Sequence, residues 1–184
     1  MSMKRVYILL ADGFECVEAL APIDVMHRAG VELVRVAVGE SLDVTSSHGL
    51  VTLRCDMVLG GEMLDDGDAL ILPGGNPGYL NLRSSDAVCR VVRHYYNSGR
   101  LVAAICGAPT ELVASGVGRG SRLTCHSTVI DEMGDYAYVG DGVVEDGNLI
   151  TAAGAGLSVE FALTVAKRLV SAETLSRVRR GMEV

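Results

Sequence analysis

Short runs of apolar residues alternate along the chain with longer segments of helical periodicity. Such runs, bounded by turn residues, are typical of parallel strands that helices cover on both faces. The pattern predicts four buried strands, at residues 6–11, 31–38, 69–72 and 101–105. Amphipathic segments between and after them predict helices at residues 15–29, 86–97, 108–115, 157–170 and 173–180.

Capping and turn residues complete this picture. Gly30 follows the first helix as a C′ residue, and Ser85 precedes the second as an N-cap. Residues 44–54 and 143–151 alternate around turns and predict two small antiparallel hairpins. No Pro- or Gly-rich linker divides the chain, so we expect a single domain over residues 1–184. Its predicted architecture is a three-layer, doubly wound α/β sandwich with a mostly parallel sheet.

Composition narrows the range of partners and compartments. The chain has 16 basic and 23 acidic residues, for a net charge of −7, which argues against nucleic acid or an anionic membrane as its partner. The apolar run at 6–11 stops at Asp12 without a cleavage-like segment, and the longest uncharged stretch, 147–159, is too short to span a membrane. The cysteines are odd in number and scattered, which indicates reduced thiols. We therefore expect a cytoplasmic protein.

Cys106 occupies the position of chemical interest. It ends the strand at 101–105 and precedes Gly107, Ala108 and a helix, the arrangement of a nucleophile elbow. The N-terminus of that helix favours the thiolate form of Cys106, so we predict that the pKa of Cys106 lies well below the roughly 8.5 of a free cysteine. The alternative is a buried core cysteine, which we prefer for the other four thiols. The corner position and the small neighbours favour a reactive Cys106.

The turns after the strands at 69–72 and 6–11 are expected near Cys106, because ligands in a doubly wound sheet bind beyond the carboxyl ends of the strands. Gly75, in the turn after the strand at 69–72, can offer a backbone N–H to a reacting oxygen, although a tight turn is the simpler explanation. Glu18 follows the first strand, and we expect regular helix to begin only near Pro22. A carboxyl buried there would have a raised pKa and could shuttle a proton. Glu15 suits a solvated acid at the helix start better.

Of the four histidines, only His126, which follows a short strand predicted at residues 122–125, falls where the sheet would bring it toward Cys106. A solvated or structurally bonded imidazole is the alternative for this residue. Cys125, His126 and Cys106 lack the usual spacing of metal ligands, so the sequence predicts no metal and no other cofactor. No phosphate-cradling loop or complete dinucleotide fingerprint is present either.

Six stretches, taken in order, resemble one family: LLADGFECVEA, DVMHRAG, LILPGGNPG, LVAAICGAPT, LTCHS and GAGLSVEFAL. The chain is similar over nearly its whole length to the ThiJ/PfpI superfamily, and within it to the parkinsonism-associated deglycase branch. This resemblance implies a flavodoxin-like sandwich of the type found in type-1 glutaminases, and a cytoplasmic homodimer. It also implies that Cys106 is the nucleophile, Glu18 its protonated partner and His126 an auxiliary group. Gly75 and Gly107 would supply backbone N–H groups.

Two departures from related branches narrow the implied function. Gly107 stands where intracellular proteases have a histidine, and no histidine follows His126 to complete a glutaminase triad. The resemblance therefore implies a glyoxalase that converts small α-oxoaldehydes without glutathione, or a deglycase that acts on glycated side chains. A noncatalytic redox sensor or chaperone with an oxidisable Cys106 is the alternative. For the dimer, we expect apolar Val25, Met26 and Ala29 around Arg28 at the interface, with His48 near the partner's Arg28.

Overall fold

A parallel sheet forms the middle of the molecule. The computed structural model describes residues 3–184 and holds a seven-stranded sheet in the order β10, β11, β7, β6, β1, β2, β5. The four predicted strands are all present, with shifts of one residue at most. They are β1 (Arg5–Leu10), β2 (Glu32–Ala37), β6 (Ala69–Leu72) and β7 (Leu101–Ile105).

The strand order is that of a flavodoxin-like fold. Five parallel strands are neighbours across the sheet in the order β2, β1, β6, β7 and β11 (Leu149–Ala152). Numbered by their sequence in the chain, these five strands have the order 2-1-3-4-5, which is that of flavodoxin-like folds. β5 (Met57–Val58) extends one edge, and β10 (Val143–Asp146) extends the other as an antiparallel partner of β11. The predicted hairpin at 143–151 is thus present, but its second strand belongs to the central sheet. The chain reverses its direction of winding between β1 and β6, which is where such folds open a crevice.

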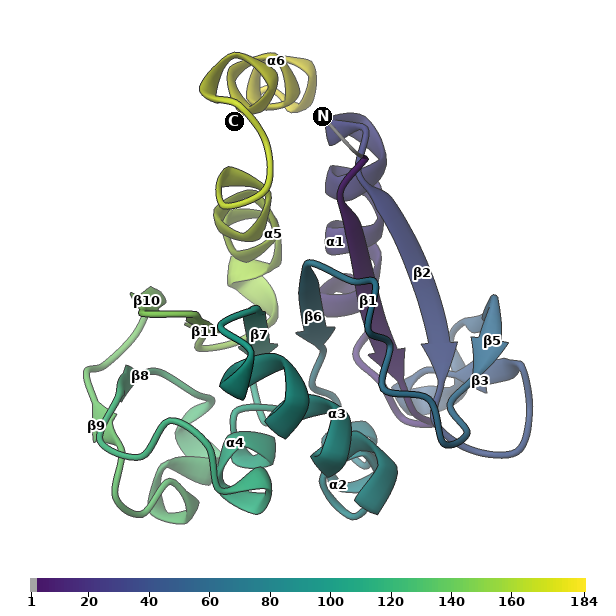
Figure 1. Cartoon of the computed structure of the whole chain (residues 1–184), viewed down its shortest axis with the longest axis vertical. Helices are drawn as coiled ribbons and strands as arrows, with labels where there is room; N and C mark the ends of the chain where they lie inside the picture. The colour runs from purple at the N-terminus through teal and green to yellow at the C-terminus, as the bar shows by residue number, and fades with distance from the viewer. Residues whose placement is uncertain (1–2) are drawn as a thin grey trace.

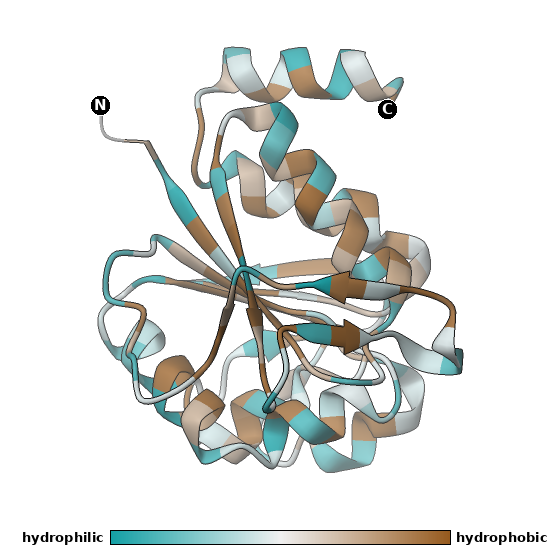
Figure 2. Cartoon of the chain, turned by 90° about the vertical axis from the view of Figure 1, so that its right-hand side faces the viewer, coloured by the Kyte–Doolittle hydropathy of each residue, from teal (hydrophilic) through white to brown (hydrophobic). Residues whose placement is uncertain are grey.

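Helices cover both faces of the sheet and create two apolar cores (Figure 1). On β1, Val6, Ile8 and Leu10 pack into one core, and Tyr7 and Leu9 into the other. Figure 2 shows mainly hydrophobic strands in the middle of the molecule and helices in which hydrophobic and hydrophilic residues alternate. One layer holds α1 (Cys16–Ala29), α5 (Ser158–Lys167) and α6 (Ala172–Met182), and the other holds α2 (Gly78–Arg83), α3 (Asp86–Asn97) and α4 (Thr110–Ser115).

Two predicted helix starts are wrong. Helix α1 begins at Cys16 rather than near Pro22, because proline removes only one intrahelical donor and the first turn still forms: the Ala19 N–H donates to the Glu15 carbonyl over 3.1 Å. Helix α4 begins at Thr110 rather than at 108, because the residues after Cys106 form a tight turn first. The predicted bounds of α3 are confirmed, and the Ser85 side chain accepts from the Val88 N–H over 3.4 Å.

Short elements attach the loops to the ends of the central strands. The predicted hairpin at 44–54 consists of β3 (Asp43–Thr45) and β4 (Thr52–Arg54), joined through η1 (Ser47–Gly49). It is held beside the start of α1, because the Gly13 N–H donates to the Thr45 carbonyl and the Ser47 N–H to the Phe14 carbonyl, each over 2.8 Å. The short strand predicted at residues 122–125 is present as β8 (Arg122–Leu123). No prediction from the sequence covers η2 (Ser127–Glu132), β9 (Ala137–Tyr138) or η3 (Ala155–Leu157).

The face of α1 expected to meet a partner is occupied within the chain. Val25 and Met26 are fully buried and Ala29 is 6% exposed, so all three belong to the core between α1 and the sheet. Arg28 is exposed and pairs with Asp24 over 2.7 Å. The apolar residues proposed for the interface are therefore the wrong ones. Within residues 3–184, no helix has the length and apolar character that a membrane crossing requires.

Candidate active site

Three strand ends converge at one edge of the sheet. β7, β6 and β1 are neighbours, and their carboxyl ends lead to Cys106, to Gly74 and Gly75, and to the first turn of α1 with Glu18. The parallel register therefore brings together residues that are 88 positions apart in the chain, which is the separation of Glu18 and Cys106. This edge adjoins the point where the direction of winding reverses.

The backbone of Cys106 has the left-handed conformation of an elbow. Its φ is 64°, a region that side chains other than glycine's rarely adopt and that costs about 1–2 kcal/mol. Two hydrogen bonds hold it there. The Cys106 N–H donates to the Ala152 carbonyl over 2.9 Å, and the His126 N–H donates to the Cys106 carbonyl over 2.8 Å. Neighbouring segments thus fix a strained residue whose side chain is partly exposed.

Glu18 is fully buried beside this thiol. The Gly74 N–H donates to its Oε2 over 2.7 Å, while no N–H or O–H among residues 3–184 donates to its Oε1. Gly74 lets the two side chains meet. A Cβ at that position would lie 2.7 Å from the Cys106 Cβ and 2.8 Å from Glu18 Oε2, which is too close for any substituent. A glycine is therefore required here by close approach.

Burial controls the protonation of Glu18. It raises the pKa of the carboxyl to about 7, although the Gly74 N–H and the Cys106 thiol oppose the increase. The acid therefore keeps its proton to a much higher pH than an exposed glutamate. A protonated carboxyl beside a sulfur can donate a hydrogen bond to it.

The pKa of Cys106 departs from the prediction. Burial raises it above the ordinary value, and the charge and hydrogen bonding of Glu18 raise it further, while the N–H groups of Gly75 and Gly107 lower it. The predicted lowering is thus wrong. Helix α4 begins four residues after Cys106, so the thiol does not lie at the first turn of this helix. When Glu18 gains a proton, the repulsion between the two charges disappears and the carboxyl can donate to the sulfur, so protonation of Glu18 lowers the pKa of Cys106 while the effect of burial remains.

A cavity of about 160 Å³ opens onto the thiol. It is lined by Gly75, Asn76, Tyr79, Cys106, Gly107, His126 and Thr128. The His126 ring is oriented by Thr128, whose N–H donates to Nδ1 over 3.3 Å and whose hydroxyl lies 2.9 Å from the same atom. The structure thus brings Glu18, Gly75, Gly107 and His126 around Cys106. Arg28 and His48 lie outside this cavity, both exposed.

Sequence reasoning missed two residues of interest. Tyr79 lines the cavity from α2, a helix that was not predicted; its only signal was its place just after the glycine turn. Glu111 is a second fully buried carboxyl, between α3 and α4. It accepts from the Ser115 hydroxyl over 2.6 Å, and burial raises its pKa to about 7. Glu111 lies outside the cavity, so it has no place among the groups around Cys106.

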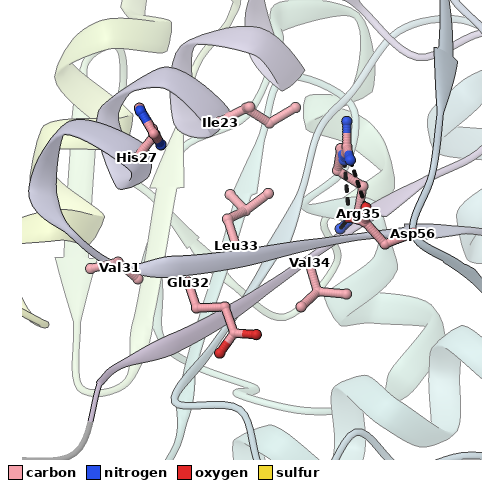
Figure 3. A pocket seen from close by; sticks show the side chains of 8 residues that line it. All are labelled: Ile23, His27, Val31, Glu32, Leu33, Val34, Arg35 and Asp56. Atoms are coloured by element: carbon pink, nitrogen blue, oxygen red, sulfur yellow. Dashed lines mark hydrogen bonds and ion pairs between the residues drawn. The ribbon is translucent and has the colours of Figure 1, made fainter.

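A larger hollow, of about 510 Å³, lies elsewhere, between α1 and strand β2 (Figure 3). Ile23 and His27 face it from α1, and an ion pair of 2.6 Å between Arg35 and Asp56 lies at one end. It contains no cysteine and none of the site residues expected from the sequence. In the part of the chain that the structure describes, no three His, Cys, Asp or Glu side chains are grouped as ligands of a metal ion.

Comparison with known proteins places this fold in a family. The model of the DJ-1/PfpI family matches residues 4–168. The chain is 37% identical to the Parkinson disease protein 7 homolog of Danio rerio, over 97% of this chain and 96% of that one. It is 33% identical to the glutathione-independent glyoxalase DJR-1.2 of Caenorhabditis elegans, over 94% and 92%. The crystal structure of Drosophila melanogaster DJ-1beta superposes with a TM-score of 0.95 at 35% identity, covering 100% of this chain and 99% of that one. The chain belongs to the DJ-1/PfpI family.

Proposed function

We propose that this protein is a glutathione-independent glyoxalase in which Cys106 is the nucleophile and Glu18 the proton donor. The observation that carries the proposal is the burial of Glu18, which keeps its carboxyl protonated up to about pH 7 beside a partly exposed thiol. A relative that is 33% identical bears the name of a glutathione-independent glyoxalase, which supports this choice of reaction.

The proposed reaction adds water to an α-oxoaldehyde without an external oxidant. Cys106 Sγ attacks the aldehyde carbon of methylglyoxal, and the aldehyde oxygen takes up a proton, which gives a hemithioacetal. A proton then moves from the former aldehyde carbon to the neighbouring carbon, so the first carbon is oxidised and the second reduced. The resulting thioester is hydrolysed to lactate, and the thiol is regenerated. Every electron stays within the substrate, so no redox cofactor is needed.

The groups around the thiol suit these steps. Glu18 protonates the carbonyl oxygen as the S–C bond forms, and then takes up a proton again. The N–H groups of Gly75 and Gly107, which lower the pKa of Cys106, stabilise negative charge at the reacting centre. His126 lines the same cavity and is oriented by Thr128, and its proposed part is to assist the proton transfer between the two carbons. Histidine does not follow Cys106, so hydrolysis of amides by a Cys–His pair is not proposed.

A time course with methylglyoxal and no added thiol tests the proposal. We expect the purified protein to consume the oxoaldehyde and to release lactate, because the protein's own thiolate replaces a free thiol. Turnover of a glycated peptide instead would make the protein a deglycase. A protein inert to both, in which peroxide converts Cys106 to a sulfinate, would be the redox sensor or chaperone.

We also propose a cytoplasmic homodimer that pairs through the start of α1. Four apolar residues near this end of the molecule are exposed: Val17 (48%), Leu20 (39%), Leu50 (73%) and Val159 (36%). Helices α1 and α5 are in contact and begin at the same edge of the sheet, and the hairpin with Leu50 is bonded beside Phe14. A twofold axis here would run α1 against its copy and bring His48 toward the partner's Arg28.

Small-angle scattering tests the dimer. The wild type is expected to have the mass of a dimer at micromolar concentration, and Leu20→Asp that of a monomer, since a charge on the apolar surface opposes burial. Val113→Asp, on α4 in the opposite helical layer and 39% exposed like Leu20, is the matched control and should remain dimeric. A monomeric wild type would contradict the proposal.

A further inference from the structure

We propose that Tyr79 limits the site to small oxoaldehydes and excludes aldehydes attached to a bulky group, including glycated side chains of proteins. This inference rests on the proposed function and specifies its substrate class. It starts from the cavity beside Cys106, in which Tyr79 has the largest side chain among the described lining residues.

The ring of Tyr79 lies directly against the backbone of Gly107. A Cβ at Gly107 would lie 2.7 Å from both Cγ and Cδ1 of Tyr79, and 3.0 Å from Cδ2. A methyl group would therefore displace the ring. The absence of a side chain at position 107 lets the aromatic ring approach the residue that follows the nucleophile. The two residues together form one wall of the cavity.

Contacts on both sides hold this wall in place. The Tyr79 N–H donates to the Gly75 carbonyl over 2.8 Å, which ties the start of α2 to the glycine turn. The Arg83 guanidinium lies 5.6 Å from the centroid of the Tyr79 ring, a cation–π contact. Arg83 in turn pairs with Glu132 of η2, the element that follows His126. The ring is thus braced between the two segments that border the cavity.

The volume enclosed by this wall is small. At about 30 Å³ for each water molecule, 160 Å³ corresponds to roughly five waters. That is close to the number of non-hydrogen atoms in methylglyoxal. A phenyl-substituted oxoaldehyde, or a lysine or arginine adduct, has more atoms than this volume holds, so we expect its substituent to meet the wall formed by Tyr79. The ring itself bears no acid or base required by the chemistry, so its expected effect is on substrate selection.

The experiment compares Tyr79→Ala with Tyr79→Phe and the wild type on methylglyoxal and phenylglyoxal. For Tyr79→Ala, we expect the ratio of kcat/KM for phenylglyoxal to that for methylglyoxal to increase at least about tenfold, the scale on which pocket size discriminates substrates. Tyr79→Phe keeps the ring and should keep the wild-type ratio. Tyr138→Ala, an exposed tyrosine on β9 outside the cavity, is the control for a general effect of removing a tyrosine.

A second measurement separates failure of this inference from failure of the proposed function. Cys106 is labelled with N-ethylmaleimide and with a larger N-aryl maleimide, and the two rates are read by mass spectrometry. In Tyr79→Ala, the rate at which the larger reagent labels Cys106 should increase at least about tenfold relative to the rate for the smaller one, whether or not the protein turns over any oxoaldehyde. An unchanged labelling ratio would overturn the role of Tyr79. An inert wild type whose ratio changes as expected would overturn only the reaction.

Discussion

Replacing Cys106 with serine is expected to abolish the consumption of methylglyoxal. A serine hydroxyl is a far weaker acid than a thiol, so it needs a general base to become a nucleophile. Glu18 is buried with a pKa raised to about 7 and so is largely protonated below that pH, position 107 is glycine rather than histidine, and the proposed part of His126 is to act on the substrate's carbon-bound proton, so none of these groups is assigned to deprotonate a hydroxyl. The loss is measured as the initial rate of oxoaldehyde disappearance in the absence of added thiol.

A matched control uses another thiol of similar exposure. Cys16 is also partly exposed, but it begins α1 and lies outside the cavity at Cys106. Cys16→Ser should therefore retain activity close to that of the wild type. Equal thermal unfolding of the two variants would exclude a folding defect. Full activity in Cys106→Ser would refute the nucleophile and leave the redox sensor as the better hypothesis.

The fold could be predicted well from the sequence because three neighbouring central strands, β6, β7 and β1 after its first residue, consist of apolar residues and tyrosine. Tyr7 and Leu9 pack into one core and Val6 and Ile8 into the other, so a continuous apolar run at 6–11 identifies a strand covered on both faces. The short elements carry less signal. β8 and β9 have two residues each, and their pairing depends on long-range contacts rather than on local periodicity.

The proximity of Cys106 and Gly75 could be predicted, because it follows from the order of the strands alone. Cys106 and Gly75 follow neighbouring strands, and parallel strands bring their carboxyl ends to the same edge. The protonation of the thiol was not predictable. It depends on the burial of Cys106 and on its distance from Glu18, neither of which the sequence contains.

The positions of Tyr79 and Glu111 depend on side-chain packing and could not be predicted from the sequence either. Tyr79 reaches the cavity because α2 turns its ring onto Gly107, and α2 has only six residues. Glu111 lies in the first turn of α4, a position at which an acidic residue is expected to face solvent, yet it is fully buried between two helices. Its partner, Ser115, is one helical turn away and could have been noticed as an i, i+4 pair.

Glu18→Gln is expected to lower turnover by about 10² to 10⁴, the usual contribution of general acid–base catalysis. Glutamine preserves the shape of the side chain, can accept from the Gly74 N–H and can donate to the Cys106 sulfur. It cannot release and regain a proton. The variant should therefore still form a covalent adduct between Cys106 and methylglyoxal, detectable by mass spectrometry, while product release fails.

The stability of this variant provides a readout that does not depend on catalysis. The folded chain keeps the Glu18 proton up to about pH 7, whereas the unfolded chain loses it near the ordinary value of 4.5. The folded state thus binds the extra proton between these values, and stability falls as pH rises through this window, by on the order of 3 kcal/mol. Glu18→Gln removes this dependence, so its stability relative to the wild type should increase between pH 5 and pH 8 in denaturant titrations. If the variant instead shows the same pH dependence as the wild type and full turnover, Glu18 neither holds the proton nor transfers it.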